Sequence, residues 1–389
     1  MKFRQLATAL VLAVPFALIA CGGSASAASS SPSVYRWGVP GSAGKIAPLE
    51  LTTPTAVTGI KGKVVQIATS NSDGYALTSS GTVWAWGVDN YGELGNGTTT
   101  LDRTQAVQVS FPAGVRIVAL PNPMPFDGAL AIDSHGDAWG WGLDASNDLC
   151  LKALVYLRPQ RIPLSDVTLA TGARTHSMFY SHGRVYACGS GQGGALGDGS
   201  TANSAKPVAV TGLPAGVRVT TLTSSWDGSG ALLSNGAYYD WGYNAAGQLG
   251  DGKTTNSDVP VQVELPSAVR QVFQGGSGAT NGQTIALLAN GSVWNWGANK
   301  DGQLGDGTTA SSAVPVRVHV PAGVRFVTIN SGGYATYAID GSGELWAWGG
   351  GQNGQLGNGG TDRAQTQPLD VHIHLKQISS TASNVAGLA

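Results

Sequence analysis

The chain has 389 residues, of which 57 are glycine and only 12% are charged, and its formal net charge is −1. This near-neutral charge argues against a surface that binds DNA or RNA, because phosphate contacts need clustered basic residues. The hydrophobic share of 42% is large enough for a packed core and argues against a disordered chain.

The N-terminal segment is typical of a bacterial export signal followed by a flexible tether. Residues 1–20 begin with two basic side chains and continue with an apolar run that is too short for a usual membrane span of about 20 residues. The run ends Leu-Ile-Ala-Cys21, which resembles the bacterial lipobox, whose cysteine is acylated. We therefore expect a lipoprotein signal peptide at 1–20, a lipidated Cys21 that anchors the protein to the bacterial cell membrane, and a Gly/Ser/Ala tether at 21–33. The alternative is cleavage near residues 25–27 and release as a secreted protein.

From residue 34 onward one short pattern recurs, a strand that ends in an aromatic residue followed by glycine. Consecutive copies lie 47 to 55 residues apart, and their final glycines are Gly38, Gly87, Gly142, Gly189, Gly242, Gly297 and Gly349. Before each copy lies a strand rich in small residues and leucine, and after most copies come a Gly-rich loop and a valine-rich strand. Four strands in each unit of about 50 residues are typical of a β-propeller blade.

The tryptophans of these strands are expected to be structural. Ten of the eleven lie in the repeated strands, and side chains two positions apart point to the same sheet face, where they can pack between blades. The tryptophans assigned to this blade core are Trp86, Trp141, Trp241, Trp296 and Trp348.

The two ends of the repeat array each supply part of one blade. Residues 375–389 resemble the first half of a unit, and residues 34–38 are the aromatic strand that should follow. We therefore predict that residues 34–389 form one all-β domain, a seven-bladed β-propeller of four-stranded antiparallel blades closed by pairing of these two segments. Closure leaves no open sheet edge, so a monomer is expected.

The aromatic-Gly strands and the Gly-rich loops resemble the regulator of chromosome condensation repeat family. The recognisable loops are GELGNG (92–97), GALGDG (194–199), GQLGDG (247–252 and 302–307) and GQLGNG (354–359). The resemblance implies a propeller that binds other proteins. Family roles include a guanine-nucleotide exchange factor, an ultraviolet receptor and a secreted bacterial inhibitor of β-lactamases, and the fold alone does not choose among them.

The chain departs from the family pattern in two ways. The family often places a histidine three residues before the small-Leu pair, and here those positions hold Asp73, Gly128, Thr175, Gly228, Gln283, Ala335 and Asn384. The third blade also lacks a recognisable Gly-rich loop in residues 144–160.

A partner-binding surface is expected on the propeller face that carries the loops before the small-Leu strands, because loops on that face are longer and more varied. Trp226 is the one tryptophan outside the repeated strands, and exposed Trp, Tyr, Arg and Met side chains anchor many interfaces. The apolar stretch 121–126 is either part of this patch or a plug over the channel mouth. The residues expected on this face are Trp226, Asp227, Met124, Phe126, Tyr91, Arg174, Tyr243 and Tyr334, with Asp73 and His176 beside them.

Sequence patterns for catalysis are missing. The chain has no nucleophile elbow, phosphate loop or dinucleotide fingerprint, so we expect neither enzyme activity nor a cofactor. His372 and His374 could project from one face of a strand, but no further ligand is recognised beside them, and no metal site is expected. For Cys150 and Cys188 both a buried free thiol and a disulfide stay open.

These observations predict a non-catalytic, surface-anchored protein-protein interaction module that binds a protein in the cell envelope or outside the cell. A nucleic-acid partner is not expected, and contact with the membrane is expected only through the N-terminal lipid. Two alternatives stay open, a propeller that binds cell-wall or other glycans and an inhibitor of an exported enzyme.

Overall fold

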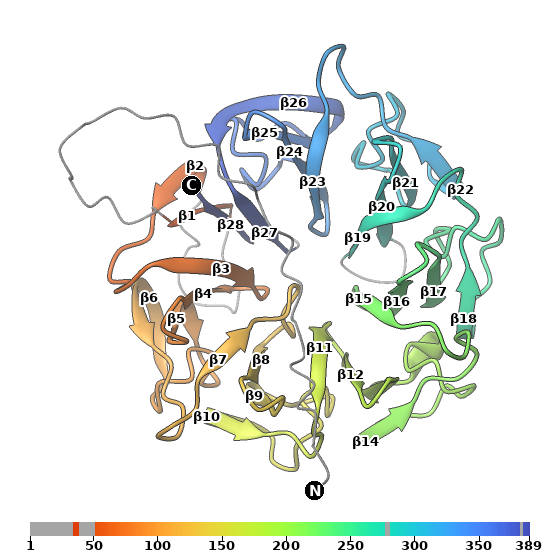
Figure 1. The fold of residues 1–389 in the computed structure, drawn as a ribbon. Coiled ribbons are helices and arrows are strands. Elements are labelled where there is room, and N and C mark those ends of the chain that lie inside the picture. Colours follow the sequence, from red (N-terminus) through yellow and green to blue (C-terminus); the bar gives the residue numbers. More distant parts are fainter. Residues whose placement is uncertain (1–33, 39–50, 277–280, 382–383) are drawn as a thin grey trace, which may run out of the picture. The chain divides into compact units, whose positions relative to one another are not determined.

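Each sequence repeat folds into one four-stranded antiparallel sheet, and seven such sheets are arranged as blades around a central axis (Figure 1). The computed structural model describes residues 34–38, 51–276, 281–381 and 384–389. The expected signal peptide, Cys21 and tether lie outside these residues. Within the described part of the chain, no helix has the length and apolar character needed to cross a membrane.

The strands of a blade follow one another from the central axis outward. The innermost strands are β3 (Val64–Thr69), β7 (Ile117–Ala119), β11 (Val167–Gly172), β15 (Val219–Ser224), β19 (Val269–Gly275), β23 (Phe326–Ser331) and β27 (Gln377–Ser380). The second strands are β4 (Asp73–Thr78), β8 (Gly128–Asp133), β12 (His176–Ser181), β16 (Gly228–Leu233), β20 (Gln283–Leu288), β24 (Ala335–Asp340) and β28 (Asn384–Leu388).

The third strands are the repeated aromatic-Gly strands. They are β1 (Val34–Gly38), β5 (Val83–Asp89), β9 (Ala138–Leu143), β13 (Arg184–Gly189), β17 (Tyr238–Gly242), β21 (Val293–Gly297) and β25 (Glu344–Gly349). The outer strands are β2 (Leu51–Ala56), β6 (Thr100–Gln108), β10 (Val155–Arg161), β14 (Ser204–Ala209), β18 (Ser257–Gln262), β22 (Ser312–Arg317) and β26 (Gln365–His374). A short 3-10 turn, η1 (Gln192–Gly194), precedes β14.

One blade is built from both ends of the described chain. Its strand order is β2-β1-β28-β27, and β1 pairs with β28 in an unbroken antiparallel register from Val34 opposite Leu388 to Gly38 opposite Asn384. The predicted architecture and its closure by these two segments are therefore confirmed.

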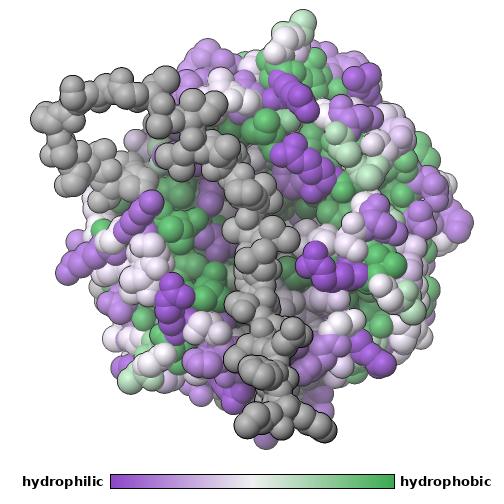
Figure 2. Space-filling model, in the orientation of Figure 1, coloured by the Kyte–Doolittle hydropathy of each residue, from purple (hydrophilic) through white to green (hydrophobic). Residues whose placement is uncertain are grey.

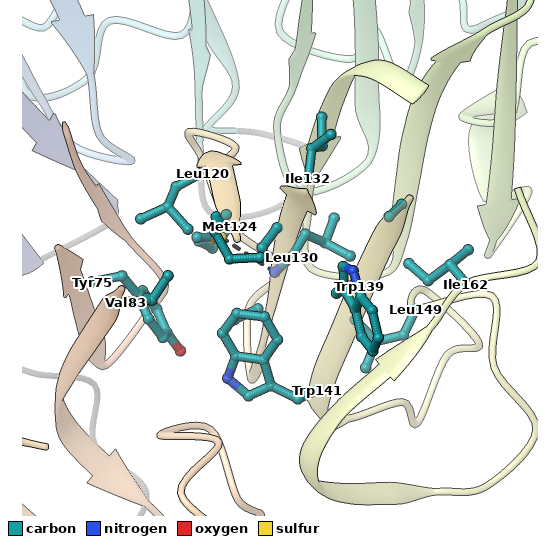
Figure 3. Packing of buried hydrophobic residues seen from close by; sticks show 14 of the residues in the cluster. Tyr75, Val83, Leu120, Met124, Leu130, Ile132, Trp139, Trp141, Leu149 and Ile162 are labelled. Carbon is teal, nitrogen blue, oxygen red and sulfur yellow. Dashed lines mark hydrogen bonds between the residues drawn. The ribbon is translucent and has the colours of Figure 1, made fainter. Parts of the chain in front are cut away.

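In five blades, a tryptophan of the third strand packs on the Gly-rich loop of the preceding blade. All five tryptophans assigned to the blade core are at most 2% exposed. Figure 3 shows Trp141 between its own sheet and Tyr75 and Val83 of the neighbouring blade. Four indole N–H groups donate to a loop carbonyl oxygen: Trp141 to Glu93 at 2.8 Å, Trp241 to Ala195 at 3.1 Å, Trp348 to Gln303 at 3.0 Å and Trp37 to Gln355 at 3.0 Å.

A glycine in each Gly-rich loop makes room for this tryptophan. Gly305 has a positive φ of 71°, and a Cβ atom added to it would lie 2.6 Å from Nε1 of Trp348. Such a contact is too close, and the backbone conformation is one that L side chains rarely adopt. The same arrangement recurs at Gly95, Gly197, Gly250 and Gly357.

The third blade keeps this loop although its sequence looks different, which corrects the expectation that residues 144–160 lack it. Asn147 and Cys150 adopt φ values of 59° and 55° where other loops have glycine. The Asp144 carboxylate accepts a hydrogen bond from the Leu149 amide at 2.9 Å, as Asp89 does from Leu94 at 3.2 Å in the preceding blade. A shared side-chain hydrogen bond therefore holds the same backbone path without the glycines.

Cys150 and Cys188 form a disulfide, with their Cα atoms 5.7 Å apart. Cys150 occupies the loop position that is glycine in the other blades, and Cys188 occupies the position of the tryptophan that would pack on it. A covalent bond thus replaces the Gly–Trp contact between these two neighbouring blades.

The strand register also corrects the residue assigned to the family's histidine position in one blade. His176, and not Thr175, lies opposite Gly189 at the start of its second strand, just as Asp73 lies opposite Gly87. The His176 side chain is fully buried, its Nε2 atom is 2.7 Å from Oγ of Ser229, and burial lowers its pKa to about 4. One blade therefore keeps the histidine that the family often has at this position, as a neutral residue.

The surface outside the core mixes polar and apolar side chains. Figure 2 shows hydrophilic and hydrophobic residues interspersed over the described part of one face. Such a mixture is ordinary for a folded protein surface, so a binding site has to be located from specific side chains.

Candidate functional site

A small cavity lies where the innermost strands of all seven blades end. Its volume is about 60 Å³, room for roughly two water molecules. Pockets for small molecules are usually about 300–1,000 Å³. The segments that line it are Asn71, 123–126, 172–174, 224–226, 274–276, 331–333 and 380–381. A ligand of any size would therefore lie across this channel mouth and not inside it.

The segment 121–126 closes part of the mouth. It follows β7, which has only three residues, and it is tied to the blades on both sides. The bonds run from the Met124 amide to the Thr69 carbonyl (3.2 Å), from Asn71 to Phe126 (3.2 Å), from Gly172 to Pro123 (3.1 Å) and from Phe126 to Ala173 (3.1 Å). The segment thus acts as a structural plug, one of its two expected roles.

Met124 is not on the surface, which corrects its expected place among the exposed residues. Its side chain is 2% exposed and points into the packing between blades, where Sδ accepts the Leu130 amide at 3.4 Å (Figure 3). Asp73 and His176, also expected on this face, are fully buried. These side chains stabilise the fold and are out of reach of a partner.

Three of the expected residues form a stack at the mouth. The Arg174 guanidinium carbon lies 3.9 Å from the centre of the Trp226 ring and 5.4 Å from that of Phe126, in cation–π geometry. The two rings are 5.6 Å apart. Arg174 is exposed and both aromatic rings are half-buried. They come from loops of three consecutive blades, so the stack depends on the ring being assembled.

Two carboxyl groups flank this stack. Burial raises the pKa of Asp127 and Asp227, and the nearby charge of Arg174 opposes that rise at both. The Thr175 hydroxyl lies 3.3 Å from Oδ1 of Asp227 and 3.2 Å from the Trp226 carbonyl oxygen, which fixes the tryptophan loop. Sequence reasoning missed Asp127 and Thr175, although each directly follows a residue that it had selected.

The three expected tyrosines do not join the stack. Tyr91 is 43% exposed in its Gly-rich loop. The Tyr243 hydroxyl accepts a hydrogen bond from Gln192 at 3.1 Å, and Tyr334 is half-buried. None of them lines the cavity. Of the expected residues, Phe126, Arg174 and Trp226 line the channel mouth and Asp227 lies near Arg174, whereas a binding role for the tyrosines stays a prediction.

The repeat unit matches the model of the regulator of chromosome condensation (RCC1) repeat, and the matches cover more than half of the chain. They lie at residues 80–120, 182–232, 235–279, 290–339 and 342–385. This chain belongs to the RCC1 repeat family.

Two curated relatives show how widely the repeat is used. Over 316 residues, the chain is 29% identical to the ultraviolet-B receptor UVR8 of Arabidopsis thaliana, which covers 79% of this chain and 70% of the receptor. It is 25% identical over 316 residues to the E3 ubiquitin-protein ligase HERC2 of Mus musculus, but spans only 6% of that protein. The matched region thus spans most of the receptor but only a small part of the ligase.

Solved structures share the fold. Human WBSCR16 superposes with a TM-score of 0.79 at 21% identity, covering 92% of this chain and 99% of that one. Prp20p of Saccharomyces cerevisiae, whose binding to Gsp1p and histones has been described, gives 0.74 at 19% identity and covers 92% of each chain. At these identities the likeness concerns the fold alone.

Proposed function

We propose that this RCC1-type propeller is a non-catalytic, surface-anchored interaction module that binds a protein partner across its channel mouth. The observation that carries the proposal is the stack of Phe126, Arg174 and Trp226. Trp and Arg are the side chains that most often dominate binding energy at protein interfaces.

The chemistry of the stack favours a peptide or protein surface with oxygen acceptors. Within the described residues, the Arg174 guanidinium makes no hydrogen bond or ion pair, so its N–H donors are available. Because it packs against both rings, the guanidinium has already lost much of its freedom, which lowers the entropic cost of binding a carboxylate or backbone carbonyl.

The glycan-binding alternative has less support. It needs several aromatic rings on one surface for sugars to stack on, but Tyr91 and Tyr243 lie apart from the Trp226 stack. An inhibitor of an exported enzyme would be one form of the proposed module, with that enzyme as the partner.

The test is capture of a partner from envelope and secreted fractions by the protein comprising residues 22–389. The Trp226→Ala variant should lose about 2 kcal/mol of binding, or roughly thirtyfold in affinity. Tyr91→Ala, which removes an exposed aromatic ring outside the mouth, should bind like the wild type. A partner that Trp226→Ala retains at full affinity would contradict the proposed site, and retention on peptidoglycan alone would support the glycan alternative.

Anchoring needs its own experiment, because it concerns Cys21. A Cys21→Ala variant of the full chain should move from the membrane fraction to the soluble fraction and lose labelling by a fatty-acid analogue. Unchanged membrane association would contradict the anchor.

A further inference from the structure

Three side chains of the kinds that bind metal ions meet at the outer edge of the β23–β26 blade, and a fourth lies beside them. Ligand atoms of Glu344, Asp370 and His372 all lie within 4.8 Å of one another. Oδ2 of Asp370 is 3.2 Å from Nδ1 of His372, and Oε2 of Glu344 is 3.1 Å from Nε2 of His374. Glu344, Asp370 and His372 thus form one group, and His374 lies beside it through its contact with Glu344.

A bulge in the outer strand brings these residues together. Asp370, His372 and His374 alternate along β26, which favours one side of the sheet. Glu344 lies opposite His374, and Trp346 lies opposite Asp370. The stretch of β26 between these pairs is therefore four residues long, whereas the facing stretch of β25 is two residues long. The extra residues shorten the distance that the three β26 side chains span. His372 itself has a φ of 58°, and its amide donates to Oδ1 of Asp370 at 2.7 Å.

The group is open to solvent on one side and supported on the other. The side chains of His372 and His374 are 83% and 68% exposed, whereas those of Asp370 and Glu344 are 31% and 17% exposed. An ion could therefore reach the imidazoles directly, while the carboxylates are held in place by the sheet.

An ordinary surface pair gives the contrast. His182 lies 3.4 Å from Asp166, both are exposed, and both have a positive φ, of 48° and 53°. No third ligand accompanies that pair among the described residues. The β25–β26 group differs because Glu344 adds a second carboxylate to it and His374 lies 3.1 Å from that carboxylate.

We propose that Glu344, Asp370, His372 and His374 bind a divalent transition-metal ion of the zinc type. Two imidazole nitrogens and two carboxylate oxygens match the ligands and the number that zinc prefers. Calcium and magnesium are disfavoured, because they require a shell of oxygen ligands. The sequence expectation of no metal site overlooked Asp370, two residues before His372, and Glu344 on the adjacent strand.

The test measures Zn²⁺ binding by tag-free protein in calorimetry, with Co²⁺ absorption as a report on coordination. We expect one ion per chain, and a weakening of about a hundredfold in the double variant His372→Ala, His374→Ala. The Glu344→Gln variant should weaken binding about tenfold. An excess of Ca²⁺ or Mg²⁺ should not compete.

The matched control is His182→Ala, which removes an exposed histidine beside a carboxylate but outside the group. It should bind Zn²⁺ like the wild type. The two imidazoles that the double variant removes are exposed in the wild type, so the variant should keep its fold. Circular dichroism checks this. Absence of Zn²⁺ binding below millimolar concentration, or binding that the double variant retains, would overturn the proposal.

Discussion

Two buried carboxyl groups replace glutamine in the Gly-rich loops. Oε2 of Glu93 accepts the Tyr91 amide at 2.7 Å, just as Oε1 of Gln303 accepts the Asp301 amide at 2.9 Å. Burial raises the pKa of Glu93 to about 7 and that of Asp148, at the same loop position, to about 8. The folded protein therefore holds protons near neutral pH that the unfolded chain releases.

This difference predicts that the protein is more stable in mild acid than in mild base. A raised carboxyl pKa contributes stability that is complete below the ordinary value of 4.5 and is lost as the pH rises through about 7. Glu93→Gln should raise the free energy of unfolding at pH 8 by on the order of 2 kcal/mol and change it little at pH 4.5. Urea unfolding at both pH values measures this.

The reverse substitution is the control for that experiment. Gln303→Glu places a carboxyl group in the equivalent loop, where Gln303 is 1% exposed, and should lower stability at pH 8. Equal shifts at both pH values for either variant would show that burial of the charge is not the cause.

At the scale of the loop element, a glycine that contacts a tryptophan can be compared with a glycine that has a similar positive φ but no neighbouring atoms. Gly305→Ala adds a Cβ atom close to Trp348 and should cost about 3 kcal/mol. Gly323→Ala has a similar φ of 83° but meets nothing within 4 Å, and should cost about 1 kcal/mol. Urea unfolding of the two variants gives both values, and equal losses would rule out the tryptophan contact as the reason for glycine.

The disulfide links two neighbouring blades at a place where other repeats have a glycine and a tryptophan. It closes a loop with a sequence separation of 38 residues, for which chain entropy predicts about 4 kcal/mol of stabilisation. A reductant should therefore lower the urea midpoint of the wild type and leave Cys188→Ser unaffected. Identical wild-type curves with and without reductant would contradict this role.

A double variant tests the idea that the disulfide stands in for the Gly–Trp contact. Cys150→Gly combined with Cys188→Trp should be more stable than Cys188→Trp alone, because Cβ of residue 150 then no longer meets the indole. Additive effects in the double-mutant cycle would show that the two positions do not pack as they do in other blades.

At the scale of the whole molecule, closure by β1 and β28 is the step on which the ring depends. Removing residues 375–389 takes away β27 and β28 and exposes the edge of β1 and the buried Trp37. We expect the truncated protein to aggregate and no longer to unfold in a single cooperative transition. Val385→Asp, at a fully buried position in β28, should act in the same direction, whereas Lys376→Ala should not. Thermal unfolding with light scattering distinguishes them.

How far the sequence could predict these features depends on whether the pattern is local. The blades and their closure were predictable, because the aromatic-Gly strand marks every unit and residues 375–389 resemble the half-unit that should precede residues 34–38. The burial of Met124 was not, because it follows from bonds to two neighbouring blades that no local pattern encodes. Asp370 was visible two residues before His372, but the approach of Glu344 depends on a bulge that strict alternation does not reveal.

The disulfide also has a mechanical consequence. Its 38-residue separation, at about 3.5 Å per extended residue, makes the oxidised chain roughly 130 Å shorter than the reduced chain when it is stretched to full length. Val34 lies opposite Leu388, so tension applied to these two residues separates the β1–β28 ladder one hydrogen-bonded pair at a time. Under load, the ring therefore opens between its first and last strands, while the two blades joined by sulfur stay attached to each other.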